Sequence, residues 1–422
     1  QYTANFIQSI IGEELIITTI KEQFAQSNKC KINYSNKPIC KDEYRIHSHT
    51  LLFQNNIENV AIEVGGCRNN PSFFITQNDS HGFDILAATF YLISRYEEYL
   101  PHEKDSYGRY THTNSLAYKY NFLHLPLVNI WLQDLMQRLQ TSKNGQRTTI
   151  NSQRFTFTPT YDIDIAYAHQ HQSIFKNIGG FFKDLMRGDI EKVIERANVY
   201  SGKVKDPFDV YEWLDGLHKK HQLQPIYFFL LAKKRSVYDK NVPPIFTGIR
   251  QLIKHHQGKY KVGIHPSWQS GDDEMLLQKE KLTLENITQT SCIKSRQHYI
   301  RLSLPETYSK LIAIGITDEY SMGFGSINGF RASVASPFYW FNLATNESTN
   351  LLIHPFCWMD ANSYFEQHLS PNEAAVELQQ YYNVVKQVGG NFTIILHNNF
   401  LTEQPQWLPW RKMYEAFLSM IE

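Results

Sequence analysis

The chain from residue 151 onward alternates between two patterns of apolar positions. Short unbroken apolar runs, such as QPIYFFLLA (224–232), are followed by segments with apolar residues at helical spacing, such as PIFTGIRQLIKHHQ (244–257). Unbroken apolar runs are typical of parallel strands buried on both faces. Comparable strand-then-helix pairs occupy 154–200, 259–288, 296–315, 351–390 and 392–421. About seven such units predict a parallel sheet covered by helices, and this number suits a barrel better than an open sheet.

Residues 1–150 show a different pattern of apolar positions, without the regular alternation of strand and helix, and this predicts a separate, smaller α/β domain. Its strands are expected at ELIITTI (14–20), HTLLF (49–53) and NVAIEV (59–64). Its helices are expected at FDILAATFYLISRYEEYL (83–100) and PLVNIWLQDLMQRLQ (126–140). The polar, glycine-containing segment 141–153 predicts a linker. We therefore expect an N-terminal domain at 1–150, of undetermined role, and a barrel domain at 151–422.

One polar cluster in the first domain has two interpretations. Arg95, Glu97 and Glu98 in RYEEY line a substrate cleft, or they form the solvated face of a helix. The solvated face is the preferred interpretation, because charged residues are mostly exposed.

The segment TFTPTYDIDIAYAH (156–169) places two carboxylates on one face of a predicted strand. Side chains alternate along a strand, so Asp162 and Asp164 point the same way, opposite Tyr161 and Ile163. Other polar residues also follow predicted strands, namely His265, Arg296, His298 and His397. Chemistry in parallel α/β barrels gathers at the carboxyl ends of the strands. We therefore expect these side chains to meet at one end of the barrel.

Each of these residues also has a purely structural interpretation. The aspartates would cap a helix or pair with lysines, and the histidines would be satisfied loop, core or turn residues. The hypothesis that all are structural, although each lies at a strand end, is the weaker one. One carboxylate and two imidazoles bind Zn²⁺ or a similar ion and leave a coordination position open. A second carboxylate would then accept the proton of a water, and a further histidine would protonate the leaving group.

Five motifs together resemble the polysaccharide deacetylase (NodB-homology) family. They are TYDID, VGIHPSWQS, SRQHY, GITDEYSMGFGSINGFRAS and IILHNN. SRYEEYLPHEKDSYGRY and LAYKYNFLHLPLVNIW resemble its bacterial branch with an extra N-terminal α/β domain. The resemblance implies an irregular (β/α)7 barrel that removes acyl groups, usually acetyl, from sugar amides or esters. It also implies a bound divalent metal, most simply Zn²⁺, with Ni²⁺ or Co²⁺ as alternatives, and a water activated by that metal as nucleophile.

The resemblance assigns roles to individual residues. Asp162 corresponds to the catalytic base, Asp164 to the metal-binding aspartate, His265 to the first metal histidine and His397 to the catalytic acid. The family's second metal histidine follows the first by four residues, and Gln269 occupies that position here. His298 is the expected replacement.

Six further residues are candidates for supporting roles. Arg296 is expected to hold the base carboxylate, with Arg331 as its rival. Asp318 and Asp360 are alternative hydrogen-bond partners for His397. Trp268 and Trp358 would form an apolar wall for an acetyl methyl group, and plain core packing is an equally good interpretation of both tryptophans.

The expected function is therefore a metal-dependent hydrolase acting on a C–N or ester bond of an acylated carbohydrate. The replacement by Gln269 motivates an alternative, a degenerate barrel that binds carbohydrate without catalysis. A phosphoesterase is a third hypothesis, weakened by the lack of a glycine-rich anion loop near the motifs. The sugar, the acyl group, the choice between amide and ester, and the oligomeric state are not determined by the sequence.

Composition excludes some partners and suggests a compartment. The 42 basic and 41 acidic residues give a formal charge of +1, so we expect neither nucleic acid nor an anionic membrane as the partner. No apolar run is long enough to predict a membrane span or a signal peptide. Five cysteines, an odd number without a CxxC pair, favour a reducing compartment, so a cytoplasmic location is expected. The chain begins at Gln1, and a leader removed before this residue stays an open alternative.

Overall fold

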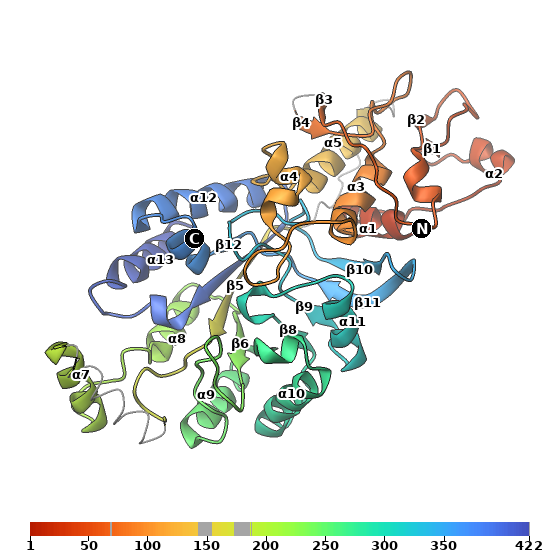
Figure 1. Cartoon of the computed structure of the whole chain (residues 1–422). Helices are drawn as coiled ribbons and strands as arrows, with labels where there is room; N and C mark the ends of the chain where they lie inside the picture. Colours follow the sequence, from red (N-terminus) through yellow and green to blue (C-terminus); the bar gives the residue numbers. More distant parts are fainter. Residues whose placement is uncertain (68–69, 142–153, 173–185, 187, 422) are drawn as a thin grey trace.

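The computed structural model describes residues 1–67, 70–141, 154–172, 186 and 188–421 (Figure 1). Its centre is a nine-stranded sheet in the order β10-β11-β9-β8-β7-β6-β5-β13-β12. Every neighbouring pair is parallel except the antiparallel hairpin of β10 and β11. The strands are β5 (Thr156–Ile163), β6 (Ile226–Leu230), β7 (Lys261–His265), β8 (Lys294–Ser295), β9 (Asp318–Glu319), β10 (Phe338–Asn342), β11 (Glu347–Ile353), β12 (Trp358–Met359) and β13 (Asn391–His397).

The parallel strands follow one another around the sheet in chain order. From β5 the order runs through β6, β7, β8, β9 and β11 on one side, and through β13 and β12 on the other. Between β11 and β12 no ladder connects the two ends of this sheet in the part of the chain that the structure describes. The protein therefore has an α/β fold built on a parallel sheet with one antiparallel edge strand.

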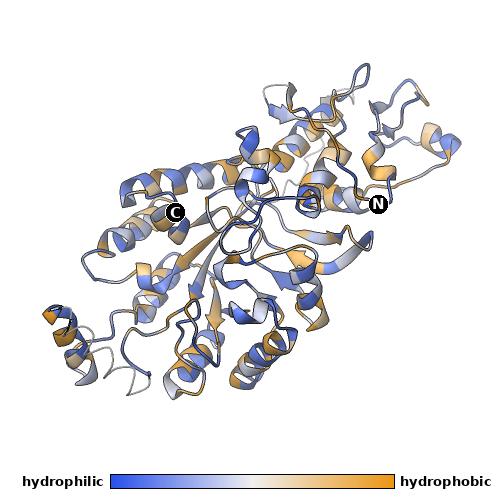
Figure 2. Ribbon diagram, in the orientation of Figure 1, coloured by the Kyte–Doolittle hydropathy of each residue, from blue (hydrophilic) through white to orange (hydrophobic). Residues whose placement is uncertain are grey.

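Helices surround the sheet on its outer side (Figure 1). They are α7 (Ile190–Tyr200), α8 (Tyr211–Lys220), α9 (Thr247–Gln257), α10 (Glu274–Thr288), α11 (Glu306–Ala313), α12 (Pro371–Gln387) and α13 (Leu408–Met420). Local sequence fixes several of their ends. Helix α12 begins with a capping box, in which Ser370 and Glu373 bond each other's backbone N–H groups, and with Pro371 in its first turn. Hydrophobic residues are prominent along the central strands, whereas the outer helices carry both hydrophobic and hydrophilic residues (Figure 2).

Most of the elements predicted for the second half are confirmed. Strand β6 is buried at every position, as an unbroken apolar run predicts for a central parallel strand. The prediction of a strand at 296–302 is wrong, because β8 ends at Ser295 and a 3-10 turn, η5 (His298–Ile300), follows. Tyr299 and Ile300 have positive φ angles of 58° and 53°, which no strand accommodates. Part of the helix expected before Tyr200 falls at 173–185 and 187, outside the described residues.

The N-terminal half contains short elements joined by long loops. They are α1 (Tyr2–Ile11), α2 (Lys21–Gln26), β1 (Ile32–Tyr34), β2 (Tyr44–Ile46), η1 (Thr50–Phe53), β3 (Gly65–Cys67), β4 (Asn70–Ser72), α3 (Ile85–Ile93), η2 (Tyr96–Tyr99), η3 (His112–Asn114), α4 (Leu116–Lys119) and α5 (Leu127–Thr141). The helix expected at 126–140 is confirmed as α5. The pattern at 83–100 forms α3 and η2, which are separated by the left-handed residue Arg95.

The three strands predicted for the N-terminal half are wrong. Residues 14–20 and 59–64 form no strand, and 49–53 contributes to the 3-10 helix η1. Ile16, Ile17 and Ile20 are 54–61% exposed, so this apolar run has no neighbouring strand that would bury it. β-propensity alone does not supply such a partner.

Both halves contribute to one hydrophobic core. Tyr2 of α1 and Phe90 of α3 pack against Phe341 of β10, with ring centroids 5.0 and 5.2 Å from it. The linker was expected at 141–153; Thr141 ends α5 and residues 142–153 lie outside the described residues, so the boundary at residue 150 stays a prediction. Among the described residues, no helix combines the length and the apolar character needed to span a membrane.

Candidate metal centre

Strand β5 positions the two carboxylates of the DID sequence. Residue Asp162 pairs in register with His397 of β13 on one side and with Phe228 of β6 on the other, and it is 2% exposed. Residue Asp164 follows just after the strand ends at Ile163. Because the neighbouring strands are parallel, their carboxyl ends meet here, as the sequence pattern predicted.

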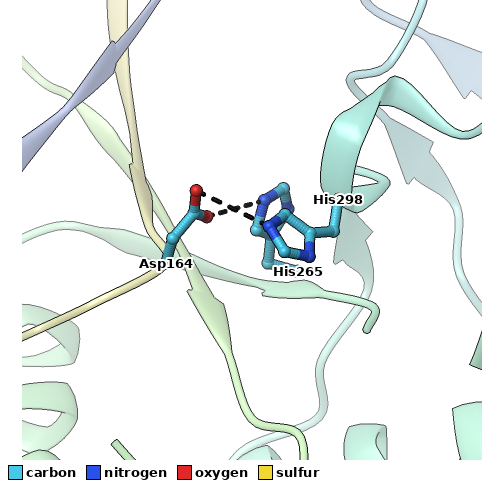
Figure 3. A group of neighbouring side chains, drawn as sticks. All are labelled: Asp164, His265 and His298. Carbon is cyan, nitrogen blue, oxygen red and sulfur yellow. Dashed lines mark ion pairs between the residues drawn. The ribbon is translucent and has the colours of Figure 1, made fainter. Parts of the chain in front are cut away.

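Asp164, His265 and His298 lie together at this end of the sheet (Figure 3). The Nε2 atom of His265 is 3.2 Å from Oδ1 of Asp164, and the Nε2 atom of His298 is 3.6 Å from Oδ2. One potential ligand atom from each residue lies within 4.8 Å of the others. His265 ends β7, whereas His298 begins the turn η5. The three expected metal ligands, Asp164, His265 and His298, therefore lie together, and we call them the triad.

The hydrogen bonds of the two imidazoles leave the Nε2 atoms free for a metal. Nδ1 of His265 donates to the carbonyl oxygen of Arg296 at 2.6 Å, and Nδ1 of His298 donates to Asp239 at 3.1 Å. Both partners are pure acceptors, so the proton of each neutral ring resides on Nδ1. Partners of this kind orient and tune metal-binding histidines in proteins.

The charges of the triad also suit a cation. Burial would raise the pKa of Asp164, but His298 and His265 outweigh it and hold this pKa well below its usual range. Burial would lower the pKa of His298, but Asp164 and then Asp239 raise it to about 9. The Oδ1 atom of Asp164 is buried and accepts no hydrogen bond. A carboxylate that faces the Nε2 atoms of two oriented imidazoles fits a divalent ion such as Zn²⁺.

Asp239 was not predicted from the sequence. It lies in the loop after β6, is fully buried, and accepts hydrogen bonds from His298 and from the backbone N–H of Trp268. Gln269, which occupies the family's usual ligand position, also donates to Asp239 at 3.3 Å. The only hint in the sequence was an acidic residue after a predicted strand, the criterion that located the other site residues.

Asp162 is paired with Arg296. The Nη1 atom of Arg296 donates to Oδ1 of Asp162 at 2.9 Å and to the hydroxyl of Thr160 at 2.6 Å. Both charged side chains are almost fully buried, and the guanidinium packs over the ring of Phe228 at 4.6 Å. The Oδ2 atom of Asp162 is 3.8 Å from Nε2 of His265. Asp162 thus lies beside the triad with its charge balanced by an arginine.

Arg331, the rival for that arginine role, lies in a different buried cluster. It donates to Glu98 through Nε at 2.8 Å, and Arg95 donates to the same carboxylate at 2.7 Å. The exposed fraction of Arg95, Glu98 and Arg331 is 1%, 3% and 1%. The interpretation of Arg95 and Glu98 as a solvated helix face is therefore wrong. Their burial depends on Arg331, which is remote in the sequence.

His397 faces the triad from β13. Its Nε2 atom is 3.8 Å from Asp164, and its Nδ1 atom is 2.6 Å from Oδ1 of the buried Asp360. Burial would lower the pKa of His397, but Asp360 outweighs it and raises the pKa to about 10. Asp360, just after β12, is therefore the hydrogen-bond partner of His397. Asp318 is not, because it pairs with His354 at 3.0 Å and with Lys294 at 3.3 Å.

The two tryptophans occupy different environments. Trp358 is fully buried in the main hydrophobic core and donates to Glu377 at 3.1 Å, so plain core packing describes it. Trp268 is partly exposed and stacks on Tyr238, with ring centroids 4.0 Å apart. Of the two, only Trp268 offers an accessible apolar surface near the triad.

Comparisons with known proteins give distant similarities. Residues 1–144 match the model of a family described as a family of unknown function (DUF7033). No curated protein matches the chain. Among solved structures, the chain is similar to a protein described as a polysaccharide deacetylase from Mycobacterium smegmatis, at 12% identity and a TM-score of 0.40, over 65% of this chain and 87% of that one.

Two further solved structures give comparable values. A polysaccharide deacetylase from Bacillus cereus is 11% identical with a TM-score of 0.32, over 64% of this chain and 88% of that one. A protein described as a polysaccharide deacetylase from Pseudomonas aeruginosa PAO1 is 10% identical with a TM-score of 0.40, over 64% and 85%.

Proposed function

We propose that the protein is a metal-dependent hydrolase that removes an acyl group, first of all acetyl, from a carbohydrate. One observation carries this proposal: the Asp164–His265–His298 triad lies between two proton-handling pairs, Asp162–Arg296 and His397–Asp360. A structural metal site would have no need of a base on one side and an acid on the other. Catalysis of hydrolysis needs both.

Asp164, His265 and His298 would hold the cation through one carboxylate and two Nε2 atoms. A donor set of this kind suits Zn²⁺ best, and Ni²⁺ or Co²⁺ accept the same ligands. When bound, such an ion polarises an acyl carbonyl and makes a neighbouring water more acidic.

Asp162 would act as the general base. Its Oδ1 atom is engaged by Arg296, and its Oδ2 atom faces His265 at 3.8 Å. The arginine holds Oδ1 in place, so Oδ2 is the oxygen that would accept a proton from the attacking water. Removal of one such proton-transfer group lowers rates by roughly 10²–10⁴-fold.

His397 would act as the general acid. Asp360 accepts a hydrogen bond from the Nδ1 atom of His397 at 2.6 Å and stabilises the imidazolium. The second proton of the imidazolium, on Nε2, then faces the triad. Delivery of this proton to the departing amine or alcohol lets the acyl–sugar bond break. Asp360 also accepts the backbone N–H of His397 at 2.7 Å and so fixes the position of the ring.

The substrate class rests on the sequence motifs that resemble the polysaccharide deacetylase family. We interpret the parallel sheet, with its strands in chain order, as the irregular (β/α)7 barrel that this resemblance implies. The competing hypothesis, a carbohydrate-binding protein without catalysis, was motivated by Gln269. The geometry weakens it, because His298 lies where a third ligand is needed.

Acetate release tests the proposal. The zinc-loaded protein would be incubated with N-acetylated and O-acetylated oligosaccharides and, in parallel, with a phosphate ester. We expect acetate from at least one acetylated sugar, and loss of that activity after chelation with recovery on addition of Zn²⁺. Phosphate release alone would favour a phosphoesterase. Binding of a sugar by a protein that retains no metal would favour the binding protein.

A further inference from the structure

We propose that four aromatic residues beside the metal centre form a wall that binds a sugar ring of the substrate. This aromatic wall consists of Tyr107, Tyr238, Trp268 and Tyr299, and the N-terminal half of the chain supplies one of its members. The inference rests on the proposed function, and it gives the N-terminal half a role at the site.

The four rings form two stacked pairs in contact with each other. Tyr238 and Trp268 stack with centroids 4.0 Å apart and planes inclined by 21°, and Tyr107 and Tyr299 stack at 5.4 Å and 25°. Edge contacts join the pairs, since the ring of Tyr107 is 5.9 Å from Trp268 and that of Tyr299 is 5.6 Å from it. Each residue comes from a different segment of the chain.

The aromatic wall is not part of the hydrophobic core. All four residues are partly exposed, and none of them belongs to the hydrophobic clusters of the described residues. Plain core packing therefore does not account for four adjoining rings at the surface. Tyrosine and tryptophan combine an apolar face with a polar tip, which suits a ligand with C–H faces and hydroxyl edges. A pyranose ring is such a ligand.

The wall adjoins the metal centre directly. Tyr299 follows the metal ligand His298, and their rings are 4.5 Å apart. On the other side, the backbone N–H of Trp268 donates to Asp239, the carboxylate that orients His298. A sugar unit bound against these rings would therefore lie next to the sugar unit whose acyl group is removed. The expected substrate is thus an oligosaccharide or polysaccharide rather than a free monosaccharide.

The N-terminal half holds this region in place. Arg109 donates to the carbonyl oxygen of Tyr299 at 2.7 Å and to that of Gly325 at 3.1 Å, and Asp105 accepts from its Nε atom at 2.7 Å. The guanidinium also lies over the ring of Tyr107, 4.8 Å from its centroid. Tyr299 has a positive φ of 58°, a conformation that costs a non-glycine residue energy and needs such support.

Calorimetric titration of the zinc-loaded full chain with tri-N-acetylchitotriose and with acetylated xylotriose tests the wall. We expect at least one of them to bind, and Tyr107→Ala to weaken that binding about tenfold, because the ring of Tyr107 stacks on Tyr299 and holds it in the wall. Tyr107→Phe keeps this ring and should retain the affinity. The control is Tyr200→Ala, which removes an exposed tyrosine at the end of α7 and should leave the affinity unchanged.

Two outcomes would overturn the inference. One is equal affinity of Tyr107→Ala and the parent, with an unchanged thermal unfolding midpoint. The other is a parent that binds neither oligosaccharide although it releases acetate from small acetylated compounds, which would leave the proposed function intact. A protein that releases no acetate but binds an oligosaccharide through Tyr107 would instead contradict the proposed function and retain the wall.

Discussion

At the scale of single residues, each side chain proposed to act at the metal centre has a partner that fixes its orientation or charge. Arg296 balances Asp162, Asp360 holds His397, and Asp239 orients His298. That these residues lie close together could be predicted, because most of them lie at strand ends and all of them lie in motifs that resemble known ones. Partners such as Asp239 could not be predicted, because a loop position in the sequence does not show which side chain it will face.

Replacement of Asp162 by asparagine removes the proposed base at nearly constant volume. We expect Asp162→Asn to lower kcat by roughly 10²–10⁴-fold, because an amide cannot accept the proton of the attacking water. Metal content should stay that of the parent, because Asp162 is outside the triad. Steady-state acetate release measures this, with Asp318→Asn as the control carboxylate paired to His354. Near-normal turnover of Asp162→Asn would show that another group is the base.

The protonation of His298 makes metal binding depend on pH. Its pKa in the metal-free protein is raised to about 9, because Asp164 and Asp239 outweigh the effect of burial. A metal must displace this proton, so below pH 9 the affinity for Zn²⁺ should rise about tenfold per pH unit and level off above it. Calorimetry in two buffers of different ionisation enthalpy would detect the released proton at pH 7. Binding without proton release would contradict the raised pKa of His298.

At the scale of elements, long apolar runs predicted their strands well, and short strands were missed. β6, β7 and β13 appear where the sequence pattern placed them, whereas β11 (Glu347–Ile353) overlaps the run predicted at 351–356 only in its last three residues. The strands β8 and β9 have two residues each, too few to show a pattern of apolar positions in the sequence. The turn that presents His298 is held by Arg109, a contact between the two halves of the chain that no local pattern contains.

Loss of Arg109 should loosen the turn η5 and weaken the metal site. We expect Arg109→Ala to lower zinc affinity about 10–100-fold, the range seen when a supporting contact of a metal ligand is lost. Arg109→Lys should recover part of this loss, because an ammonium still donates to the carbonyl of Tyr299. Competition with a chromophoric chelator gives the affinities. Arg138→Ala, which breaks a surface pair with Asp134, is the control and should bind zinc as the parent does.

At the scale of the whole molecule, a buried ionic cluster connects the N-terminal half to the sheet-forming half. Arg95 and Arg331 both bond Glu98, and all three are almost fully buried. The sequence favoured a solvated face here. This prediction failed because Glu98 is buried by its pairing with Arg331, which lies in the other half of the chain. Charged residues are buried only when they are paired in this way.

Removal of the negative charge from this cluster should destabilise the protein. We expect Glu98→Gln to lower the free energy of unfolding by about 3–5 kcal/mol, because Arg331 then stays buried without its carboxylate and Arg95 keeps only Glu97. Guanidinium-induced unfolding measures the change. Asp134→Asn, at a half-exposed pair with Arg138, should cost less than about 1 kcal/mol.

The carboxylate of Glu98 should also make the free energy of unfolding depend on pH in the acidic range. Burial would raise the pKa of Glu98, but Arg331 and Arg95 outweigh it and lower the pKa to about 2. A lowered folded-state pKa contributes stability above the usual pKa of 4.5, and this contribution is lost as the pH falls from there toward 2. The difference in stability between the parent and Glu98→Gln should therefore shrink over this interval. A constant difference from pH 6 to pH 2 would contradict the pairing.

The presence of a metal at Asp164, His265 and His298 is the central claim, and elemental analysis of the purified protein tests it most directly. The parent, His298→Ala and the control His354→Ala, whose histidine pairs with Asp318 outside the triad, would be supplied with Zn²⁺ and freed of excess. We expect about one ion per chain in the parent and in His354→Ala, and a large loss in His298→Ala. A parent without bound metal, or a His298→Ala variant that keeps its ion, would contradict the site described here.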